Sequence, residues 1–510
     1  MKKSYLLSIL VFQLGFAQAP AIEWQKSLGG TGSDQAYSIQ QTNDGGYIVA
    51  GATNSNDGDV TGNHVSGDCW IVKLNSTGSI QWQKAIGGTG EDYITSIQQT
   101  TDGGYIVACY TTSNNGDVTG NHGNADCWVV KLNSTGTIQW QKALGGTDYD
   151  YPNSIQETTD GGYIVAGETS SNNGNVTGNH GISDNWVVKL NSAGTIQWQK
   201  ALGGTADENA ASIQQSSDGG YIVAGYTASN NGDVIGNHGY EDYWVVKLTS
   251  TGSIEWQKTL GGTGSDEAKS IQQTADGGYI VAGITSSFDG DVTGYHGGNG
   301  YDAWIVKLNS TGTIQWQKAM GGTGEDYITS IQQTTDGGYI VAGYTFSFDG
   351  DVTGNHGHCD YWVIKFDIAG TVLWQKALGG TGFDFAFSIQ QTTDGGYIIA
   401  GITDSNNYDV NGNHGTTDCW VVKLGSDLGT DTFSANTIKT FPNPTSSIIT
   451  VQGGDNLVFD KMIVTDLTGK TVLLHEQGSN QINVEQLSCG MYLLQAFSGE
   501  EQFMSKFVKE

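Results

Sequence analysis

Residues 38–85 read SIQQTNDGGYIVAGATNSNDGDVTGNHVSGDCWIVKLNSTGSIQWQKA, and this stretch recurs along the chain with small changes. The 14 tryptophans mark the recurrence, because they divide into two series with the same spacing. The first series is Trp24, Trp82, Trp140, Trp198, Trp256, Trp316 and Trp374, and the second is Trp70, Trp128, Trp186, Trp244, Trp304, Trp362 and Trp420. The step is 58 residues except for one step of 60, so the sequence predicts seven copies of one repeat.

One repeat has the pattern of four β-strands. They are expected at Ser38–Thr42, Tyr47–Ala52, Cys69–Leu74 and Ile80–Ala85, with side chains alternating between two faces in the third strand. The Asp-Gly-Gly between the first two strands favours a tight turn, because these residues tolerate positive φ. A long polar loop, Asn54–Asp68, separates the second strand from the third.

Four antiparallel strands repeated seven times predict an all-β fold, a seven-bladed β-propeller with one sheet per blade. The repeats begin out of phase. Ile22–Lys26 match the fourth strand of a repeat, whereas the last repeat stops at its third strand, Cys419–Leu424. The N-terminal strand would complete the last blade and close the ring, which leaves no sheet edge exposed. A linear β-solenoid is the alternative, and it gives this phase shift no role.

Two kinds of loop are expected on one face of the ring. Successive antiparallel strands reverse direction, so the long loop and the Gly-Gly-Thr-Gly-x-Asp loop, residues 29–34 in the first repeat, emerge at the same end of the sheet. We call this end the long-loop face. Binding normally uses long loops on a rigid scaffold, which makes the long-loop face the candidate binding surface.

The charge of the chain excludes some partners. The formal net charge is −30, and all 22 basic residues are lysine. Such a chain is a poor match for nucleic acid and suits a cation or a basic partner, although the charge also serves solubility. Thr42–Gly46 half-resemble the Asp-box turn of sialidase-like propellers. Sialidases hold the substrate carboxylate with arginines, so that enzyme class is excluded.

The N-terminus has the pattern of a secretory signal peptide, expected at residues 1–19. Lys2 and Lys3 precede a mostly apolar run, Tyr5–Phe16, and Ala17-Gln18-Ala19 has the small-x-small pattern of a cleavage site. No later segment reaches about 18 apolar residues, so no transmembrane segment is expected.

Acidic residues in the long loop suggest a Ca²⁺ site. The Asp-Val-Thr-Gly-Asn-His stretch groups Asp, Asn and Thr oxygens around a glycine, and Ca²⁺ takes about six to eight such ligands. The candidate ligands are Asp59, Asp117, Asp233, Asp291, Asp351 and Asp409, with Asn175 in the remaining repeat. The loop lacks the spacing and the bidentate Glu of an EF-hand. The alternative is that these side chains hydrogen-bond loop backbone and brace the next blade.

Aromatic residues near the first strands form the candidate ligand-binding set, because their rings can stack on sugars or contact a protein. They are Tyr93, Tyr149, Tyr327, Phe383 and Phe385, all expected on the long-loop face. Packing beside the turns is their alternative role. A catalytic pocket needs a few unlike residues, whereas residues 87–108 are identical to residues 321–342. The chain is therefore not expected to be an enzyme.

After Leu424 the repeat stops. A polar linker, residues 425–440, leads to short alternating strands and turns. The motifs there are Phe441-Pro442-Asn443-Pro444, Asp466-Leu467-Thr468-Gly469-Lys470, Gly490-Met491-Tyr492 and Lys506-Phe507-Val508-Lys509. In this order they resemble the type A sorting domain of the type IX secretion system, with Phe441 where the family has Tyr. The resemblance implies a small β-sandwich, contact with the secretion machinery and crossing of the outer membrane, usually with removal of this domain.

The expected domain order is signal peptide 1–19, propeller 20–424, linker 425–440 and sorting domain 441–510. The repeats resemble the Trp- and Gly-rich propeller repeats of other proteins exported in this way, a resemblance that carries no defined activity. The first hypothesis is an extracellular or cell-surface binding and adhesion module for a glycan or a protein. The alternatives are a polysaccharide-acting enzyme, such as a glycoside hydrolase or lyase, and a purely structural surface protein.

Overall fold

The computed structural model describes residues 18–64, 66–298, 300–427, 438–452, 458–466, 470–475, 478–498 and 501–510. The chain divides into two compact units, Met1–Asp427 and Leu428–Glu510. The regular elements of the described residues are all β-strands, which confirms the all-β class. Most of the expected signal peptide and most of the linker lie outside the described residues.

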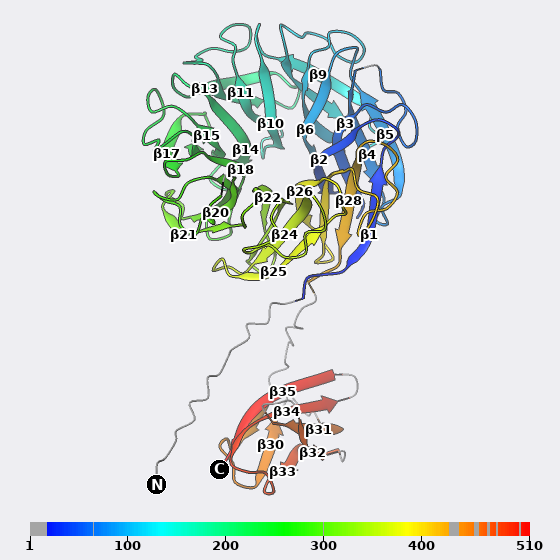
Figure 1. Ribbon diagram of the computed structural model, residues 1–510, viewed down its shortest axis with the longest axis vertical. Coiled ribbons are helices and arrows are strands. Elements are labelled where there is room, and N and C mark those ends of the chain that lie inside the picture. Colours follow the sequence, from blue (N-terminus) through cyan, green and yellow to red (C-terminus); the bar gives the residue numbers. More distant parts are fainter. Residues whose placement is uncertain are drawn as a thin grey trace. The chain divides into compact units, whose positions relative to one another are not determined.

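The first unit is built from four-stranded antiparallel sheets whose strands follow chain order. The first of these sheets contains β2 (Asp34–Gln41), β3 (Tyr47–Thr53), β4 (Asp68–Leu74) and β5 (Ile80–Ile86). The same order recurs in β6 (Asp92–Gln99), β7 (Tyr105–Thr111), β8 (Asp126–Leu132) and β9 (Ile138–Leu144); in β10 (Asp150–Glu157), β11 (Tyr163–Thr169), β12 (Asp184–Leu190) and β13 (Ile196–Leu202); in β14 (Glu208–Gln215), β15 (Tyr221–Thr227), β16 (Asp242–Leu248) and β17 (Ile254–Leu260); in β18 (Asp266–Gln273), β19 (Tyr279–Thr285), β20 (Asp302–Leu308) and β21 (Ile314–Met320); and in β22 (Asp326–Gln333), β23 (Tyr339–Thr345), β24 (Asp360–Phe366) and β25 (Val372–Leu378). Figure 1 shows the sheets around a common centre, with their first strands innermost, as in a propeller-like fold.

The remaining sheet of this unit combines the two ends of the repeat region. Across the sheet its strands are β1 (Ile22–Leu28), β28 (Asp418–Leu424), β27 (Tyr397–Thr403) and β26 (Asp384–Gln391). β1 pairs antiparallel with β28, and Ser27 lies opposite Trp420. The strand left over at the N-terminus therefore takes the fourth place in this sheet (Figure 1).

The first strand of each sheet begins earlier than the sequence predicted. Its expected range in the first repeat was Ser38–Thr42, whereas β2 begins at Asp34. The register of β2 against β3 shifts between Ala36 and Ser38, which marks a β-bulge. A bulge reverses the alternation of inward and outward side chains. Residues 34–37 therefore do not continue the alternation that predicted a strand from Ser38.

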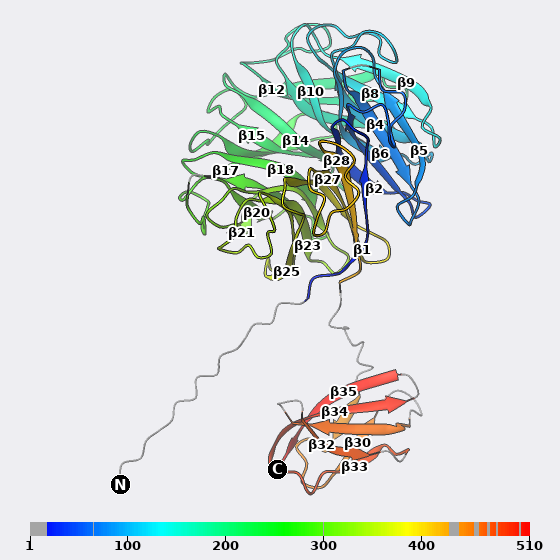
Figure 2. The same cartoon turned by 45° about the vertical axis from the view of Figure 1, so that its right-hand side comes forward.

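The middle strands of each sheet are buried on both faces. All residues of β3 and β4 are buried. Ile71 of one sheet packs with Val107 and Trp128 of the next sheet in one hydrophobic cluster. Burial of a large apolar side chain stabilises a fold by about 1.5–3 kcal/mol, so these contacts hold neighbouring sheets face to face (Figure 2).

A buried lysine ties the third strand of each sheet to the turn after the first strand. Lys73 is 4% exposed, and its Nζ lies 3.0 Å from Asp44 Oδ2 and donates to the Leu74 carbonyl at 3.0 Å. The equivalent ion pairs are Lys131–Asp102, Lys189–Asp160, Lys247–Asp218, Lys307–Asp276, Lys365–Asp336 and Lys423–Asp394. The recurring Trp-x-x-Lys frame is explained by this pair.

The second unit has two sheets around one core. One contains β29 (Lys439–Phe441), β30 (Ile448–Gln452) and β33 (Gln481–Asn483), and the other β32 (Thr471–His475), β31 (Lys461–Thr465), β34 (Gly490–Ser498) and β35 (Glu501–Lys509). Ile449 of the first sheet and Met462 and Leu494 of the second are fully buried in one cluster. In the part of the chain that the structure describes, no helix has the length and apolarity to cross a membrane.

Candidate ligand-binding site

The first strands of the sheets combine constant and variable positions. Each ends in Ser-Ile-Gln followed by Gln or Glu, whereas the second and fourth residues differ from repeat to repeat. The second residues are Gln35, Tyr93, Tyr151, Asn209, Glu267, Tyr327 and Phe385, and the fourth are Tyr37, Thr95, Asn153, Ala211, Lys269, Thr329 and Phe387. Side chains two residues apart share one side of a strand, and here that side faces away from the buried third residue.

All seven of the fourth residues and four of the second residues line a cavity of about 690 Å³, which we call the aromatic cavity. It is lined by Tyr37, Tyr93, Ile94, Thr95, Tyr110, Asn153, Asn209, Ala211, Tyr226, Glu267, Lys269, Tyr327, Ile328, Thr329, Tyr344 and Phe387. The lining residues lie in the first half of the first strands and in the last part of the second strands, next to the long loops. Cavities that hold small ligands are typically about 300–1,000 Å³, so this cavity has a suitable size.

Two stacked tyrosine pairs line the aromatic cavity. Tyr93 lies on Tyr110 with ring centroids 5.3 Å apart, and Tyr327 lies on Tyr344 at 4.7 Å, both with an interplanar angle of 21°. Tyr93 and Tyr327 occupy equal positions in the identical stretches 87–108 and 321–342. The repeat thus supplies one aromatic unit twice, from two sheets that are not neighbours in the chain.

Polar side chains from β10, β14 and β18 form another part of the wall. Lys269 Nζ lies 2.7 Å from Glu267 Oε2. Asn153 Nδ2 donates to Asn209 Oδ1 at 3.0 Å, and Asn209 Nδ2 donates to Glu168 Oε2 at 2.7 Å. Burial raises the pKa of Glu168. The aromatic cavity therefore combines flat ring surfaces with amide, carboxylate and ammonium groups.

The tyrosines keep their phenolic protons over the physiological range. Burial, with a contribution from Tyr93, raises the pKa of Tyr37 to about 12. The pKa of Tyr93 is raised by burial and by the Glu91 carboxylate. Each phenol is therefore a hydrogen-bond donor at neutral pH, and Tyr37 and Tyr327 already donate to Gln35 Oε1 and Glu325 Oε2.

The structure separates the five aromatic residues that the sequence singled out. Tyr93 and Tyr327 line the aromatic cavity. Phe385 contacts the ring of Tyr344 edge-on at 4.7 Å, beside the lining. Tyr149 and Phe383 lie outside it and are 48% and 40% exposed. Most residues that sequence reasoning missed stand at the second and fourth positions of the first strands, and Tyr110, Tyr226 and Tyr344 stand at the sixth position of the second strands. Their departure from the repeat is the signal that could have found them.

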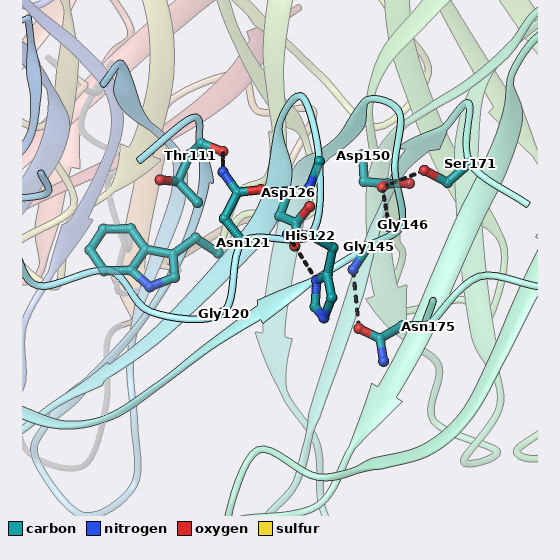
Figure 3. A network of polar contacts seen from close by, with 12 residues as sticks. Thr111, Gly120, Asn121, His122, Asp126, Gly145, Gly146, Asp150, Ser171 and Asn175 are labelled. Atoms are coloured by element: carbon teal, nitrogen blue, oxygen red, sulfur yellow. Dashed lines mark hydrogen bonds and ion pairs between the residues drawn. The ribbon is translucent and has the colours of Figure 1, made fainter. Parts of the chain in front are cut away.

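The candidate calcium ligands face backbone instead of one another. Asp59 Oδ2 accepts a hydrogen bond from Gly29 N at 3.3 Å, while Asp59 N donates to Gly29 O at 2.9 Å. In the repeat that has Asn175 instead, Asn175 Oδ1 accepts from Gly145 N at 3.2 Å (Figure 3). The contact therefore needs an oxygen acceptor but no negative charge. Among the described residues, no group of three or more His, Cys, Asp or Glu is arranged to hold a metal ion. The observed contacts are those of the bracing alternative.

Two sets of buried polar contacts lie close together, one at the third strand of a sheet and one at the first strand of the next (Figure 3). Asp126 Oδ2 accepts hydrogen bonds from His122 N at 3.1 Å and His122 Nδ1 at 2.5 Å. Asp126 Oδ1 is buried and has no hydrogen-bond partner among the described residues. Nearby, Asp150 Oδ2 accepts from Gly146 N at 2.7 Å and Ser171 Oγ at 2.8 Å. Burial raises the pKa of both carboxyls, and the charge of Asp126 adds to the shift of Asp150.

In the second unit, the Pro-Asn-Pro motif binds the last strand. Asn443 Nδ2 donates to Lys506 O at 3.1 Å, and Asn443 Oδ1 accepts from Val508 N at 2.9 Å. The Tyr492 ring stacks on Phe507 at 5.7 Å. The first, third and fourth motifs therefore meet in one small structure, whereas Gly469 of the second motif lies outside the described residues.

Comparison with known proteins identifies the C-terminal segment. Residues 439–510 match the family described as Secretion system C-terminal sorting domain. This match confirms the resemblance of the four motifs to a type IX sorting domain. It indicates export to the cell surface or the extracellular space through the type IX secretion machinery.

The remaining comparisons give distant likenesses. The chain is 23% identical over 421 residues to regulatory protein FlaEY of Caulobacter vibrioides, covering 73% of this chain and 43% of that protein. PorZ, a surface component of the type IX secretion system of Porphyromonas gingivalis, is 11% identical, with a TM-score of 0.41 over 95% of this chain and 60% of that one. BamB from Moraxella catarrhalis is 13% identical, with a TM-score of 0.34 over 79% of this chain and 99% of that one. This chain thus spans less than half of FlaEY.

Proposed function

We propose that this chain, which carries a C-terminal sorting domain for type IX secretion, is an extracellular or cell-surface binding module on a closed seven-bladed β-propeller. The proposal includes a signal peptide at 1–19, the propeller at 20–424 and a linker at 425–440. The ligand enters the aromatic cavity from the long-loop face. The protein binds its ligand without transforming it.

Contacts between the two ends of the repeat region support a closed ring. β1 pairs with β28 in one sheet. Ile398 and Val421 of the sheet that holds β1 pack in one hydrophobic cluster with Val49 and Trp70 of the sheet that follows β1. Asp34 N also donates to Thr417 O at 2.8 Å. The same types of contact join other neighbouring sheets, so no edge of the array is left without a neighbour.

The observation that carries the binding function is the convergence of the variable positions on the aromatic cavity. The end of the first strands that lies outside the aromatic cavity keeps Ser-Ile-Gln in every repeat, whereas the part that lines the cavity varies. A ligand in the aromatic cavity meets every repeat at the fourth residue of its first strand and four of the repeats also at the second residue. Different side chains at those positions are what recognition of one asymmetric ligand requires.

The ligand class that fits the aromatic cavity best is a neutral or basic glycan. Aromatic faces stack on the apolar faces of sugar rings, and amide and carboxylate groups bond sugar hydroxyls. In the lining, the Glu267 carboxylate is paired with the Lys269 ammonium at 2.7 Å, so the wall offers no unpaired cation to an acidic ligand. A protein ligand is the alternative, which an array without any bound glycan would favour.

The test is a glycan array followed by titration of the purified chain with the oligosaccharide that binds. Tyr327→Ala removes one face of a stacked pair and is expected to weaken binding about tenfold, which corresponds to about 1.4 kcal/mol. Tyr149→Ala is the matched control, because that ring is exposed outside the aromatic cavity. Equal losses in the two variants, or an array without any bound glycan, contradict the proposal.

The second candidate, a polysaccharide-acting enzyme, rests on Glu267 in the lining. Its Oε2 lies 2.7 Å from Lys269 Nζ, so the carboxylate is engaged in an ion pair at the wall of the cavity. A reducing-end assay on the same oligosaccharides distinguishes the two functions. Turnover that disappears in Glu267→Gln would establish the enzyme.

A further inference from the structure

A second cavity on the axis is lined by only two residue types. Its volume is about 260 Å³, and its wall consists of the Ile-Gln pairs at the ends of the first strands. The glutamines are Gln40, Gln98, Gln156, Gln214, Gln272, Gln332 and Gln390. We call this space the glutamine cavity. It shares no lining residue with the aromatic cavity.

Each of these glutamines has its amide oxygen held by the neighbouring sheet. Gln40 Oε1 accepts a hydrogen bond from Gln99 N at 2.7 Å. The equivalent bonds are Gln98 to Glu157 N at 2.6 Å, Gln156 to Gln215 N at 2.7 Å, Gln214 to Gln273 N at 2.6 Å, Gln272 to Gln333 N at 2.5 Å, Gln332 to Gln391 N at 2.6 Å and Gln390 to Gln41 N at 2.6 Å. The last bond joins the first and last repeats, so the series has no end.

The orientation of each amide follows from these bonds. A backbone N–H can donate only to the Oε1 atom of a glutamine amide, so the Nε2 atom of that amide must occupy the other position. No Nε2 atom of these glutamines donates to another group of the protein among the described residues. Since the amide oxygens are held by the next sheet and the same side chains line the glutamine cavity, their N–H donors are the amide groups left for a ligand there.

Most of the charges around this end of the axis are paired, and Glu157, next to Gln156, is a carboxylate that accepts from Thr101 instead of pairing with a cation among the described residues. No acidic or basic side chain lines the glutamine cavity. The turn that follows the first strand carries an aspartate in each repeat, and a buried lysine neutralises it, as in Asp44 and Lys73 at 3.0 Å. Partial positive charges on the amide donors therefore face the cavity without a carboxylate among them. Converging N–H groups of this kind favour an anion.

We propose that the glutamine cavity is a binding site for one small oxyanion, of the sulfate or carboxylate class, on the axis of the sheets. The oxygens of such an ion accept hydrogen bonds from several Nε2 atoms at once. The amide oxygens are already bonded between sheets, so these side chains offer a cation no free oxygen. The site is independent of the ligand of the aromatic cavity.

The test replaces a donor without removing the bond between sheets. Gln214→Glu keeps an oxygen for Gln273 N and substitutes a carboxylate oxygen for the Nε2 donor. The fold accepts such an exchange at the neighbouring position, where Glu157 replaces Gln and its Oε2 accepts from Thr101 N at 2.8 Å. Gln273→Glu is the matched control, because Gln273 Oε1 also accepts a backbone N–H, from Ser217 at 2.8 Å, but does not line the cavity.

The measurement is the thermal midpoint of the full chain in sodium sulfate, sodium acetate and sodium chloride at equal ionic strength. We expect a saturable increase with sulfate or acetate over chloride, about a tenfold weaker half-saturation in Gln214→Glu, and no change in Gln273→Glu. A response to one salt alone identifies the oxyanion. Equal responses in all three salts, or in both variants, overturn the proposal. Should Gln214→Glu fail to fold, Gln214→Met takes its place. Bound selenate is then located by anomalous scattering in crystals of this variant and of the wild type. Absence of selenate from the axis in the wild type overturns the proposal.

Discussion

At the scale of single residues, the carboxyl groups buried between sheets respond most directly to pH. Burial raises the pKa of Asp242, Asp326 and Asp384 to about 6, against about 4 in an unfolded chain. Between pH 7 and pH 4 the folded state therefore binds more protons than the unfolded state, and its stability rises as the pH falls. Asp44, Asp102, Asp160 and Asp276 behave oppositely, because their hydrogen bonds and lysines lower their pKa to about 2. Their contribution is present above pH 4 and is lost as the pH falls through 2.

We expect the stability to be greatest near pH 4–5, where the buried carboxyls are protonated and the lysine-paired carboxyls are still ionised. This pH lies above the range in which proteins usually unfold in acid. Thermal unfolding followed by circular dichroism from pH 8 to pH 2 measures it. Asp242→Asn imitates the protonated group and is expected to raise the midpoint at pH 7.5 and to reduce the gain on acidification. A thermal midpoint that decreases steadily from pH 7.5 to pH 5 would contradict the raised pKa values of the buried carboxyl groups.

At the scale of the element, the lysine in the third strand has a stabilising role that depends on one turn residue. Lys131 is 4% exposed and lies 2.9 Å from Asp102 Oδ2, whose side chain is 56% exposed. Asp102→Asn leaves a buried ammonium without its counter-charge and is expected to lower the free energy of unfolding by about 1–2 kcal/mol, less than for a fully buried pair. Urea denaturation of the purified chain measures the loss.

The double variant Lys131→Met with Asp102→Asn provides the control for this ion pair. Its apolar side chain no longer needs a counter-charge, so we expect it to recover part of the stability lost in Asp102→Asn. If the single and double variants are equally unstable, the aspartate acts through the turn backbone, where its Oδ1 accepts from Gly104 N at 2.9 Å.

At the scale of the whole molecule, β1 has the largest expected effect of any single strand. It occupies the fourth place in the sheet of β26–β28, and Gln25 Oε1 accepts a hydrogen bond from Trp420 Nε1 at 2.8 Å. Deletion of residues 22–28 exposes the edge of β28. We expect a strong decrease in the thermal midpoint and association of the chain, measured by calorimetry and size-exclusion chromatography.

Truncation at the other end is the control for the β1 deletion. The second unit has its own core, and the compact units divide after Asp427. A chain that ends at Asp427 is expected to keep the thermal midpoint of the first unit. Unchanged stability on deletion of β1 would favour an open array over a closed ring.

The strands, their grouping into sheets and the sorting domain could be predicted from the sequence, because the patterns that indicate them are periodic or lie within short segments. The Trp spacing, the strand pattern and the phase shift at Ile22–Lys26 predicted four-stranded sheets and the strand shared between the two ends. The motifs from Pro442 to Lys509 identified the sorting domain, since each is a short contiguous signal. Asp59 and its equivalents were ambiguous, because the sequence does not tell a metal ligand from a brace for a backbone amide.

The tertiary structure alone decided which variable residues meet. Tyr93 and Tyr327 lie 234 positions apart in the chain, and only the arrangement of sheets around an axis brings both to one cavity with Asn153 and Lys269. The bulge in the first strands, which the alternation pattern does not reveal, sets which side chains face that axis. The seven glutamines likewise look like ordinary strand ends in the sequence. Their amide orientations exist only because each oxygen meets a backbone N–H of the next sheet. The repeated sequence thus determines the sheets, whereas the sites depend on contacts between sheets that are distant along the chain.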